Sequence, residues 1–182
     1  SPEPDPYTDP IQINISCPQV QGVITNILCN GQGNGSIDLT VTGGVGPYNF
    51  TWAGPEPIGN IEDPTNLIAG TYNVTVTETA SGAGCTTTGT YTITQPAALT
   101  ASLVSTAVDT CGLGNGAIIV TATGGTEEYS FSIDNIAYQP SPEFYNLNAG
   151  TYTIWVDDAN GCGPIQVSGI NITATPVPDL SL

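Results

Sequence analysis

The ionisable side chains of this sequence include no cation, and this limits the chemistry that they offer. The chain has 16 Asp and Glu residues and no Lys, Arg or His, so its formal net charge is −16 at pH 7. Without His or Lys there is no imidazole base or ligand and no Schiff base. Without cations the chain also lacks the groups that neutralise nucleic-acid phosphates or anionic membrane surfaces. We therefore expect no nucleic-acid partner.

Carboxylates alone can still catalyse a reaction of the glycosidase type, which uses a pair of them. The candidates for such a pair are Glu127, Glu128 and Asp134. Their surroundings predict surface turns, and the first half of the chain has no equivalent pair. We therefore predict that the protein is not an enzyme.

A second polar group offers metal chemistry. Asp157, Asp158 and Asn160 stand just before Gly161 and carry hard oxygen ligands of the type that calcium prefers. A segment rich in Asp, Asn and Gly is also typical of an ordinary turn, and the first half of the chain offers only Glu78 there. The expectation is no cofactor, with calcium at these three residues as the alternative.

Aromatic side chains are candidates for both binding and packing. Trp52 and Trp155 could stack on sugars, but both lie in strand-like segments, where aromatic residues more often belong to the core. We predict that both are core residues. Tyr72 and Tyr152 each follow Ala-Gly-Thr, and this position fits the corner tyrosine that hydrogen-bonds back to the chain beside a sandwich strand.

Five asparagines begin Asn-X-Ser/Thr sequons and are candidates for glycosylation: Asn14, Asn34, Asn49, Asn73 and Asn171. Several such sequons arise by chance in a chain this rich in Asn and Thr. Their occupancy is therefore a hypothesis, which the intact mass of the native protein tests.

An internal repeat reveals the elements that position these residues. Residues 29–44 recur as residues 111–125, residues 48–52 recur as residues 129–133, and residues 66–76 recur as residues 146–156. The two copies are about 80 residues apart, which is the length of a whole domain and too long for a solenoid unit.

Within each copy the apolar residues have the period of strands. Ile37, Leu39 and Val41 alternate with polar residues, as do Val74 and Val76, so one face packs inward and the other faces water. Gly-Gly and Asn-Gly pairs between these segments are typical of turns. The pattern predicts an all-β protein of two tandem immunoglobulin-like β-sandwich domains, each closed by a disulfide.

The predicted domains are residues 17–98 and residues 99–182, the second with a C-terminal tail, after a Pro-rich extension over residues 1–16. Within the extension, Ile11, Ile13 and Ile15 alternate with polar residues and predict a strand. This strand is either donated to a neighbouring subunit or closes its own domain. No apolar run is long enough to cross a membrane, so we expect no direct membrane insertion.

The repeat also sorts the five cysteines. It pairs Cys29 with Cys85 and Cys111 with Cys162, so that one bridge brackets each copy. Closing such a loop is worth about 4 kcal/mol in the chain-entropy model and implies an oxidising compartment. The close spacing of a cysteine metal site is absent. Cys17 is left over and is a free thiol, a partner for a cysteine outside this chain, or a link between subunits.

Three motifs of the first copy carry a family resemblance: Gly-Asn-Gly-Ser-Ile, Thr-Gly-Gly-Val-Gly-Pro-Tyr-Asn-Phe-Thr-Trp and Leu-Ile-Ala-Gly-Thr-Tyr. The second copy repeats them and closes on Asp-Asp-Ala-Asn-Gly-Cys. These motifs resemble the SprB-type repeat of surface adhesins in gliding bacteria. The resemblance implies long secreted proteins that display many tandem copies on the cell surface and serve adhesion or motility.

The sequence thus predicts a non-catalytic, extracellular cell-surface protein that acts as an adhesin or as a segment of a filament or stalk. The alternative is a carbohydrate-binding module of a secreted hydrolase, for which an exposed aromatic platform is expected. The expected partners are other copies of the chain, in filaments or tandem arrays, and surface glycans.

Overall fold

The computed structural model describes residues 16–79 and 84–176. The described residues form strands, turns and irregular segments without any helix, which confirms the predicted all-β class. Accordingly, no helix suited to crossing a membrane occurs in this part of the chain. Ile11, Ile13 and Ile15 of the predicted N-terminal strand, and the sequon residue Asn14, lie outside the described residues.

The chain divides into two compact units, which are described separately. Unit 1 comprises Ser1–Thr25 and Gly35–Ile93, and unit 2 comprises Asn26–Asn34 and Thr94–Leu182. The predicted division assigns residues 26–34 and 94–98 to the first domain, whereas the structure groups both segments with unit 2. The reason is local bonding, because the Ile27 amide donates to the Thr94 carbonyl at 3.0 Å.

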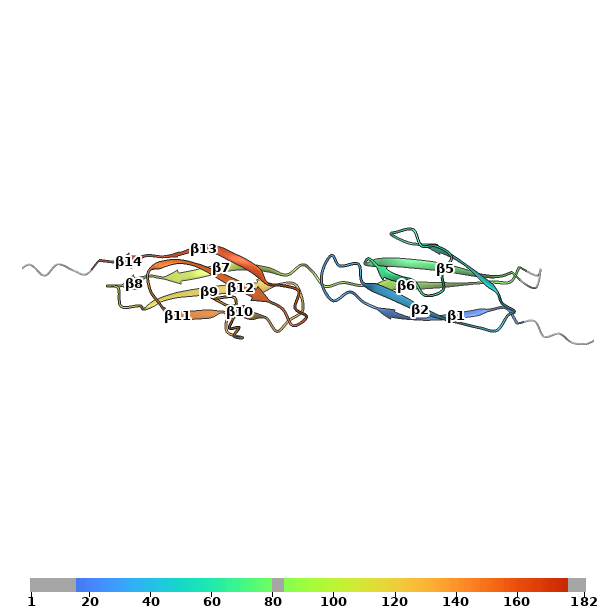
Figure 1. The fold of residues 1–182 in the computed structure, drawn as a ribbon, viewed down its shortest axis with the longest axis horizontal. Coiled ribbons are helices and arrows are strands. Elements are labelled where there is room, and N and C mark those ends of the chain that lie inside the picture. Colours follow the sequence, from blue (N-terminus) through green and yellow to red (C-terminus); the bar gives the residue numbers. More distant parts are fainter. Residues whose placement is uncertain (1–15, 80–83, 177–182) are drawn as a thin grey trace, which may run out of the picture. The chain divides into compact units, whose positions relative to one another are not determined.

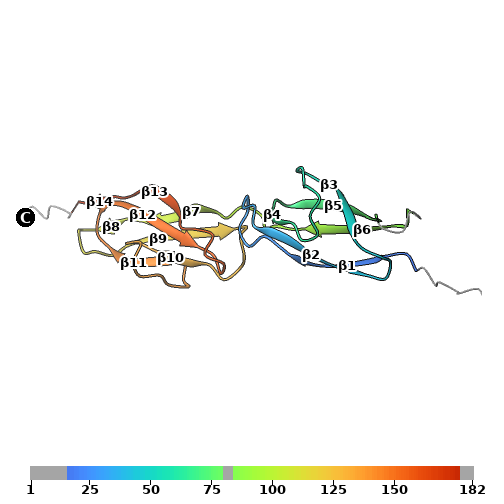
Figure 2. The ribbon, with the colours of Figure 1, turned by 45° about the vertical axis from the view of Figure 1, so that its right-hand side comes forward.

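Unit 1 is a sandwich of two three-stranded antiparallel sheets. One sheet has the order β1-β2-β4 and the other has the order β3-β5-β6. The strands are β1 (Gln19–Thr25), β2 (Gly35–Thr42), β3 (Tyr48–Ala53), β4 (Thr65–Leu67), β5 (Gly70–Glu78) and β6 (Thr86–Ile93). Figure 1 shows β1 and β2 in one layer and β5 and β6 in the other, and Figure 2 shows β3 beside β5. Both layers contribute to the core, with Ile37, Leu39, Leu67, Tyr72, Val74, Val76 and Ile93 buried.

Unit 2 repeats this arrangement. Its sheets have the orders β11-β9-β7 and β10-β12-β13, and a short parallel pair joins β8 to β14. The strands are β7 (Thr100–Ala107), β8 (Asp109–Thr110), β9 (Gly116–Thr123), β10 (Ser130–Ser132), β11 (Glu143–Leu147), β12 (Gly150–Asp157), β13 (Ile165–Ile172) and β14 (Ala174–Thr175). The core of the unit consists of Ile118, Val120, Phe131, Phe144, Ile154, Val156, Ile170 and Ile172.

Alternation of side chains explains why these segments form half-buried strands. In β2 the residues at Ile37 and Leu39 are buried while Asp38 and Thr40 are exposed. β9 repeats the pattern with Ile118 buried and the outer positions more open. Successive side chains of a strand point to opposite faces, so each sheet buries one face and exposes the other. The predicted pair of immunoglobulin-like sandwiches is confirmed.

The two predicted corner tyrosines are confirmed as well. The Tyr72 hydroxyl donates to the Ile68 carbonyl at 2.9 Å, and the Tyr152 hydroxyl donates to the Asn148 carbonyl at the same distance. Each bond returns to a carbonyl four residues upstream. The Tyr72 hydroxyl also lies 3.0 Å from a Glu56 carboxylate oxygen, so this corner joins two segments of unit 1.

The Tyr72 corner makes alkaline stability a readout of the fold. Burial of the phenol, and then its bond to Glu56 and the Glu56 charge, raise the pKa of Tyr72 to about 12, although the bond to Ile68 opposes this. The pKa of Tyr72 in the folded protein exceeds the unfolded value of 10.0. The protonated Tyr72 phenol therefore contributes its full stabilisation of the fold below pH 10, and this stabilisation is lost as the pH approaches 12. We expect Tyr72→Phe to cost about 1–2 kcal/mol at pH 7 and to flatten the fall of stability between pH 10 and 12. Guanidinium unfolding across this pH range measures both effects, and identical alkaline slopes in the two proteins would contradict the prediction.

Candidate functional site

The disulfides differ from the predicted pairs. All five cysteines belong to the described residues, and Cys17 bonds to Cys85 with 5.4 Å between their Cα atoms. Cys29 bonds to Cys162 with a Cα–Cα distance of 5.3 Å, and Cys111 is the free thiol. The predicted bridges Cys29–Cys85 and Cys111–Cys162 are therefore wrong, as is the prediction that Cys17 has no partner within this chain and is a free thiol or an intermolecular link. Each unit still has one disulfide, because residue 29 belongs to unit 2.

The length of a strand explains the error in the first copy. Cys17 precedes β1 and Cys29 follows it, and the seven residues of β1 span about 23 Å. Cys85 lies at the Cys17 end, because the Glu78 amide donates to the Cys85 carbonyl and the Gly44 amide donates to the Ser16 carbonyl. A disulfide requires Cα atoms closer than about 7 Å, which Cys29 and Cys85 cannot reach.

The same geometry separates the cysteines of the second copy. Cys111 stands before β9, whereas Cys162 lies near the turn that follows β9. The eight residues of β9 span about 26 Å, so Cys111 and Cys162 lie at opposite ends of unit 2. The two cysteines that bracket a copy in the sequence are thus the two that its strands keep apart.

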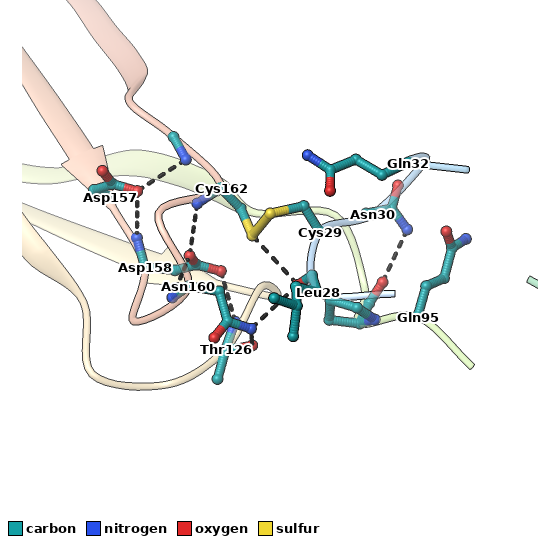
Figure 3. Close-up of a disulfide and its surroundings, with 12 residues drawn as sticks. Leu28, Cys29, Asn30, Gln32, Gln95, Thr126, Asp157, Asp158, Asn160 and Cys162 are labelled. Atoms are coloured by element: carbon teal, nitrogen blue, oxygen red, sulfur yellow. Dashed lines mark hydrogen bonds between the residues drawn. A yellow bond between two sulfur atoms is a disulfide. The ribbon is translucent and has the colours of Figure 1, made fainter. Parts of the chain in front are cut away.

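Buried carboxylates hold the turns beside the disulfides. Figure 3 shows Asp158 next to the Cys29–Cys162 bridge. Its Oδ2 accepts the Thr126 amide at 2.8 Å, and its Oδ1 accepts the amides of Asn160 at 3.0 Å and Cys162 at 2.9 Å. Its side chain is only 6% exposed. Burial by itself raises the pKa of Asp158, but the backbone amides outweigh it and hold this pKa below the ordinary value of 3.8.

Glu78 has the matching role in unit 1. It is 3% exposed, and its Oε1 accepts the Val45 amide at 2.6 Å. The glycines before the two amides, Gly44 and Gly125, have φ of +65° and +59°, and a Cβ atom at either position would collide with the carboxylate. Each turn therefore requires glycine for two reasons. Glycine adopts the positive φ easily, and it leaves room for the close approach of the buried acid.

The three candidate calcium ligands lie together in this loop, where several of their polar atoms make hydrogen bonds within the fold. Oδ1 of Asp157 accepts the amides of Asp158 and Gly163 at 2.9 and 2.8 Å. The side-chain amide of Asn160 donates to the Leu28 carbonyl and to Thr126 Oγ1 (Figure 3). In the described part of the chain, no three or more His, Cys, Asp or Glu side chains gather as a metal site. Calcium at Asp157, Asp158 and Asn160 stays the alternative to the predicted absence of a cofactor.

The two tryptophans lie on different faces of their sheets. Trp52 is opposite Val74 in the register of β3 with β5, so it shares the core-facing side, where it is half-buried and donates to the Ile61 carbonyl. Trp155 stands between the buried residues Ile154 and Val156 and therefore points to the outer face of its sheet. The predicted core position of Trp155 is wrong, and the alternation of β12 was the signal that identifies it.

Unit 2 has an open cleft of about 620 Å³, which no pattern in the sequence indicates. Its lining is mostly apolar and includes two glutamates. The lining residues are Val120, Thr121, Ala122, Glu127, Glu128, Tyr129, Phe131, Pro140 and Pro142. The lining comes from three separate segments, so no local motif marks it. The two glutamates of the candidate acid–base pair therefore lie at an apolar cleft.

Asp134, the third candidate acid, has a structural role. Its Oδ1 accepts the Ala137 and Ile136 amides at 2.9 and 2.8 Å and the Ser132 hydroxyl at 2.8 Å. These bonds lower the pKa of Asp134. The bond from the Ala137 amide has the largest effect, followed by those from Ile136 and Ser132. A general acid of a glycosidase requires the opposite shift. The side chain closes a turn of the type expected for Asp followed by Asn.

Four of the five candidate glycosylation sites lie in the described residues. Asn34, Asn73 and Asn171 are exposed, in the loop before β2, in β5 and in β13, and Asn49 is half-buried in β3. The exposed side chains are accessible to modification, and the occupancy of all the sites stays a prediction.

Comparison with known protein families finds one match, in which the SprB repeat model covers residues 22–56. No curated protein matches the chain. The matched stretch contains most of β1, all of β2 and β3, and the loop that carries Cys29. This match supports an SprB-type repeat in the first copy, and the SprB repeat is a non-catalytic repeat of cell-surface proteins. An SprB-type repeat in the second copy stays a prediction.

Proposed function

We propose that this chain is a non-catalytic extracellular protein of the cell surface, where it acts as an adhesin or as a segment of a filament or stalk. The observation that carries the proposal is the SprB repeat match over residues 22–56, which falls on a disulfide-bearing β-sandwich. Proteins that display such repeats work through the surface that they present.

The chemistry of the chain supports this proposal. Two disulfides suit an oxidising compartment. The buried carboxylates Glu78, Asp109 and Asp158 accept backbone amides and thereby hold loops in place. Asp134 likewise closes a turn. The hydrogen bonds of these acids therefore stabilise the loops of a scaffold that is suited to display on a surface.

Retention of coated particles tests the adhesive role. Beads carrying the folded protein are expected to stay on cells and on abiotic surfaces under flow at least fivefold more often than control beads. The control is the same protein after reduction and alkylation, because it has the same composition and nearly the same charge but lacks both disulfides. Equal retention of the two kinds of bead would refute the adhesive role.

A carbohydrate-binding role is the second candidate, and the position of Trp155 favours it. Trp155 faces outward from β12, and Tyr138 is 38% exposed. Burial, and then the charges of Asp157 and Asp134, raise the pKa of Tyr138, and its hydroxyl donates to Asn135 Oδ1 at 2.8 Å. Outward aromatic rings beside polar groups are the features that stack on sugars.

A glycan array distinguishes this candidate. If Trp155 is a platform, Trp155→Ala loses about tenfold or more in affinity for the glycans that the wild type binds. Tyr145→Ala is the matched control, because Tyr145 is 58% exposed on β11 in the other sheet of the same unit. Absence of binding by the wild type, or equal loss in both variants, would exclude the platform.

Self-association into filaments or tandem arrays belongs to the proposal. The strand predicted over residues 11–16 is its first candidate mechanism and lies, except for Ser16, outside the described residues. A strand with isoleucine at every second position would add apolar side chains to a neighbouring sandwich. A second mechanism follows from the cysteines.

A further inference from the structure

Cys111 occupies in the second copy the position that Cys29 occupies in the first. The Ile27 amide donates to the Thr94 carbonyl at 3.0 Å, and the Asp109 amide donates to the Thr173 carbonyl at 2.9 Å. Each cysteine lies two residues after the residue whose amide donates this bond. Each also precedes an Asn-Gly pair that leads into β2 or β9. Of these two equivalent cysteines, Cys29 is bonded and Cys111 is free.

Cys85 and Cys162 are likewise equivalent. Each follows a glycine in the connection between two antiparallel neighbours, β5 to β6 for Cys85 and β12 to β13 for Cys162. Each also follows a buried carboxylate that accepts a turn amide, Glu78 before Cys85 and Asp158 before Cys162. The Cys29–Cys162 bridge therefore joins a cysteine of the Cys111 kind to one of the Cys85 kind.

Cys17 substitutes for such a partner in the first copy. The Gly44 amide donates to the Ser16 carbonyl and the Gly125 amide donates to the Ala97 carbonyl, so Cys17 corresponds to Ala98. Ala98, Cys29 and Cys162 line one small pocket of unit 2. Cys29 thus reaches Cys162 beside Ala98, which is the counterpart in unit 2 of the residue that bonds to Cys85 in unit 1. Because alanine has no sulfur, Cys162 is bonded to the cysteine of the preceding copy.

We propose that Cys111 of one chain forms a disulfide with Cys85 of a second copy of this chain, displacing Cys17. The new bond repeats the Cys29–Cys162 bond with equivalent residues. This proposal rests on the proposed function, because it supplies a covalent chemistry for self-association. It also assigns Cys17 the role of a cap that protects Cys85 until exchange.

The surroundings of both sulfurs suit this exchange. Asp109 is 2% exposed and holds the Cys111 loop by accepting the Gly114 amide at 2.8 Å. The Cys111 amide donates to Thr175 Oγ1 at 3.2 Å, so the loop is ordered on both sides of the thiol. Leu113 nearby is 76% exposed, an apolar side chain that has no cover within the described chain. On the other side of the exchange, Cys17 is exposed and is the leaving sulfur.

The step balances without an added oxidant. The Cys111 thiolate attacks the Cys85 sulfur, the Cys17–Cys85 bond breaks, and Cys17 leaves as a thiolate that takes up a proton. One disulfide and one thiol are consumed, and one of each is formed. Because Cys111 and Cys85 are different residues, the link is heterologous and each added chain brings a further free Cys111 and a further capped Cys85.

Two complementary variants isolate the reaction. The donor, Cys17→Ser with Cys85→Ser, retains the free Cys111, and the acceptor, Cys111→Ser, retains the Cys17–Cys85 bond. They are mixed without oxygen at mildly alkaline pH and separated by non-reducing electrophoresis. Chymotrypsin then yields the linked peptides for mass spectrometry, since the chain has no Lys or Arg for trypsin.

The expected product is a heterodimer with a Cys111–Cys85 peptide, one free thiol now located at Cys17, and no product from either variant alone. The wild type at high concentration gives a ladder of oligomers that Cys111→Ser abolishes. Circular dichroism checks the fold of the donor, and the wild-type ladder provides the readout if the donor has lost its sheets. Persistence of monomers in both assays, or bridges between two Cys111 residues only, would overturn the proposal.

The failure of this exchange and the failure of the adhesive role are distinguishable. Bead retention is measured with Cys111→Ser, which keeps both observed disulfides and cannot form the link. If the beads are retained but the wild type forms no oligomers, the exchange is overturned and the adhesive role stands. If the wild type forms oligomers but the beads are not retained, the adhesive role is overturned and the exchange stands.

Discussion

Replacing Cys162 by Ser is expected to lower the free energy of unfolding of unit 2 by about 4–5 kcal/mol, because the Cys29–Cys162 bridge closes a long loop in the unfolded chain. Cys29→Ser is expected to have the same effect. Guanidinium unfolding followed by circular dichroism measures both values, and chymotryptic mapping of the wild type identifies the bonded pairs directly.

Double variants sharpen this test, since two substitutions that remove one bond do not add. We expect Cys29→Ser with Cys162→Ser to be no less stable than either single variant. Cys29→Ser with Cys85→Ser removes two bonds, so its losses add. Cys111→Ser is the matched control and is expected to change stability by less than about 0.5 kcal/mol. If Cys29→Ser and Cys85→Ser failed to add, the observed pairing would be incorrect.

Replacing Asp158 by Asn is expected to cost about 2–4 kcal/mol at pH 7. The buried carboxylate accepts hydrogen bonds from the backbone amides of Thr126, Asn160 and Cys162, and hydrogen bonds to a charged acceptor are among the strongest in proteins. Asparagine keeps the shape but has only one acceptor oxygen, so its NH₂ group would face the amide of Thr126 or that of Cys162. Asp38→Asn is the matched control, because Asp38 is exposed on β2.

The pH dependence of the same variant provides a second readout. The pKa of Asp158 in the folded protein lies below the ordinary value of 3.8, so its contribution to stability is full above that value. The contribution is lost as the pH falls from about 4 through the folded pKa. We therefore expect acid to destabilise the wild type more steeply than Asp158→Asn, as unfolding midpoints between pH 2 and about 6 will show. Parallel pH profiles of the two proteins would contradict this assignment.

Features that depend on neighbouring residues could be predicted from the sequence. Alternation at Ile37 and Leu39 identifies a half-buried strand because the side-chain period of a strand is two. The Ala-Gly-Thr-Tyr motif identifies the corner bond of Tyr72, whose acceptor is the carbonyl of Ile68, only four residues upstream. Both are local, so one short stretch of chain contains all the partners.

Features that join distant segments were missed for the corresponding reason. The repeat shows that Cys29 matches Cys111, but equivalence does not say which end of a sandwich each one occupies. The outward position of Trp155 follows from the apolar residues Ile154 and Val156 on either side of it, because membership of a strand does not by itself decide which face a side chain occupies. The cleft at Phe131 and Pro142 is assembled from three segments, which no pattern in one of them reveals.

By itself the sequence determined that the chain is built from two copies of one β-sandwich and that its chemistry proceeds without cationic side chains, because composition and side-chain period are properties of the chain alone. Only the tertiary structure decided that Cys29 meets Cys162, that Cys17 meets Cys85, and that Cys111 remains free. The physical reason is distance. A strand of seven or eight residues separates the sulfurs that the repeat pairs, and the fold brings other sulfurs within the few ångströms that a disulfide requires.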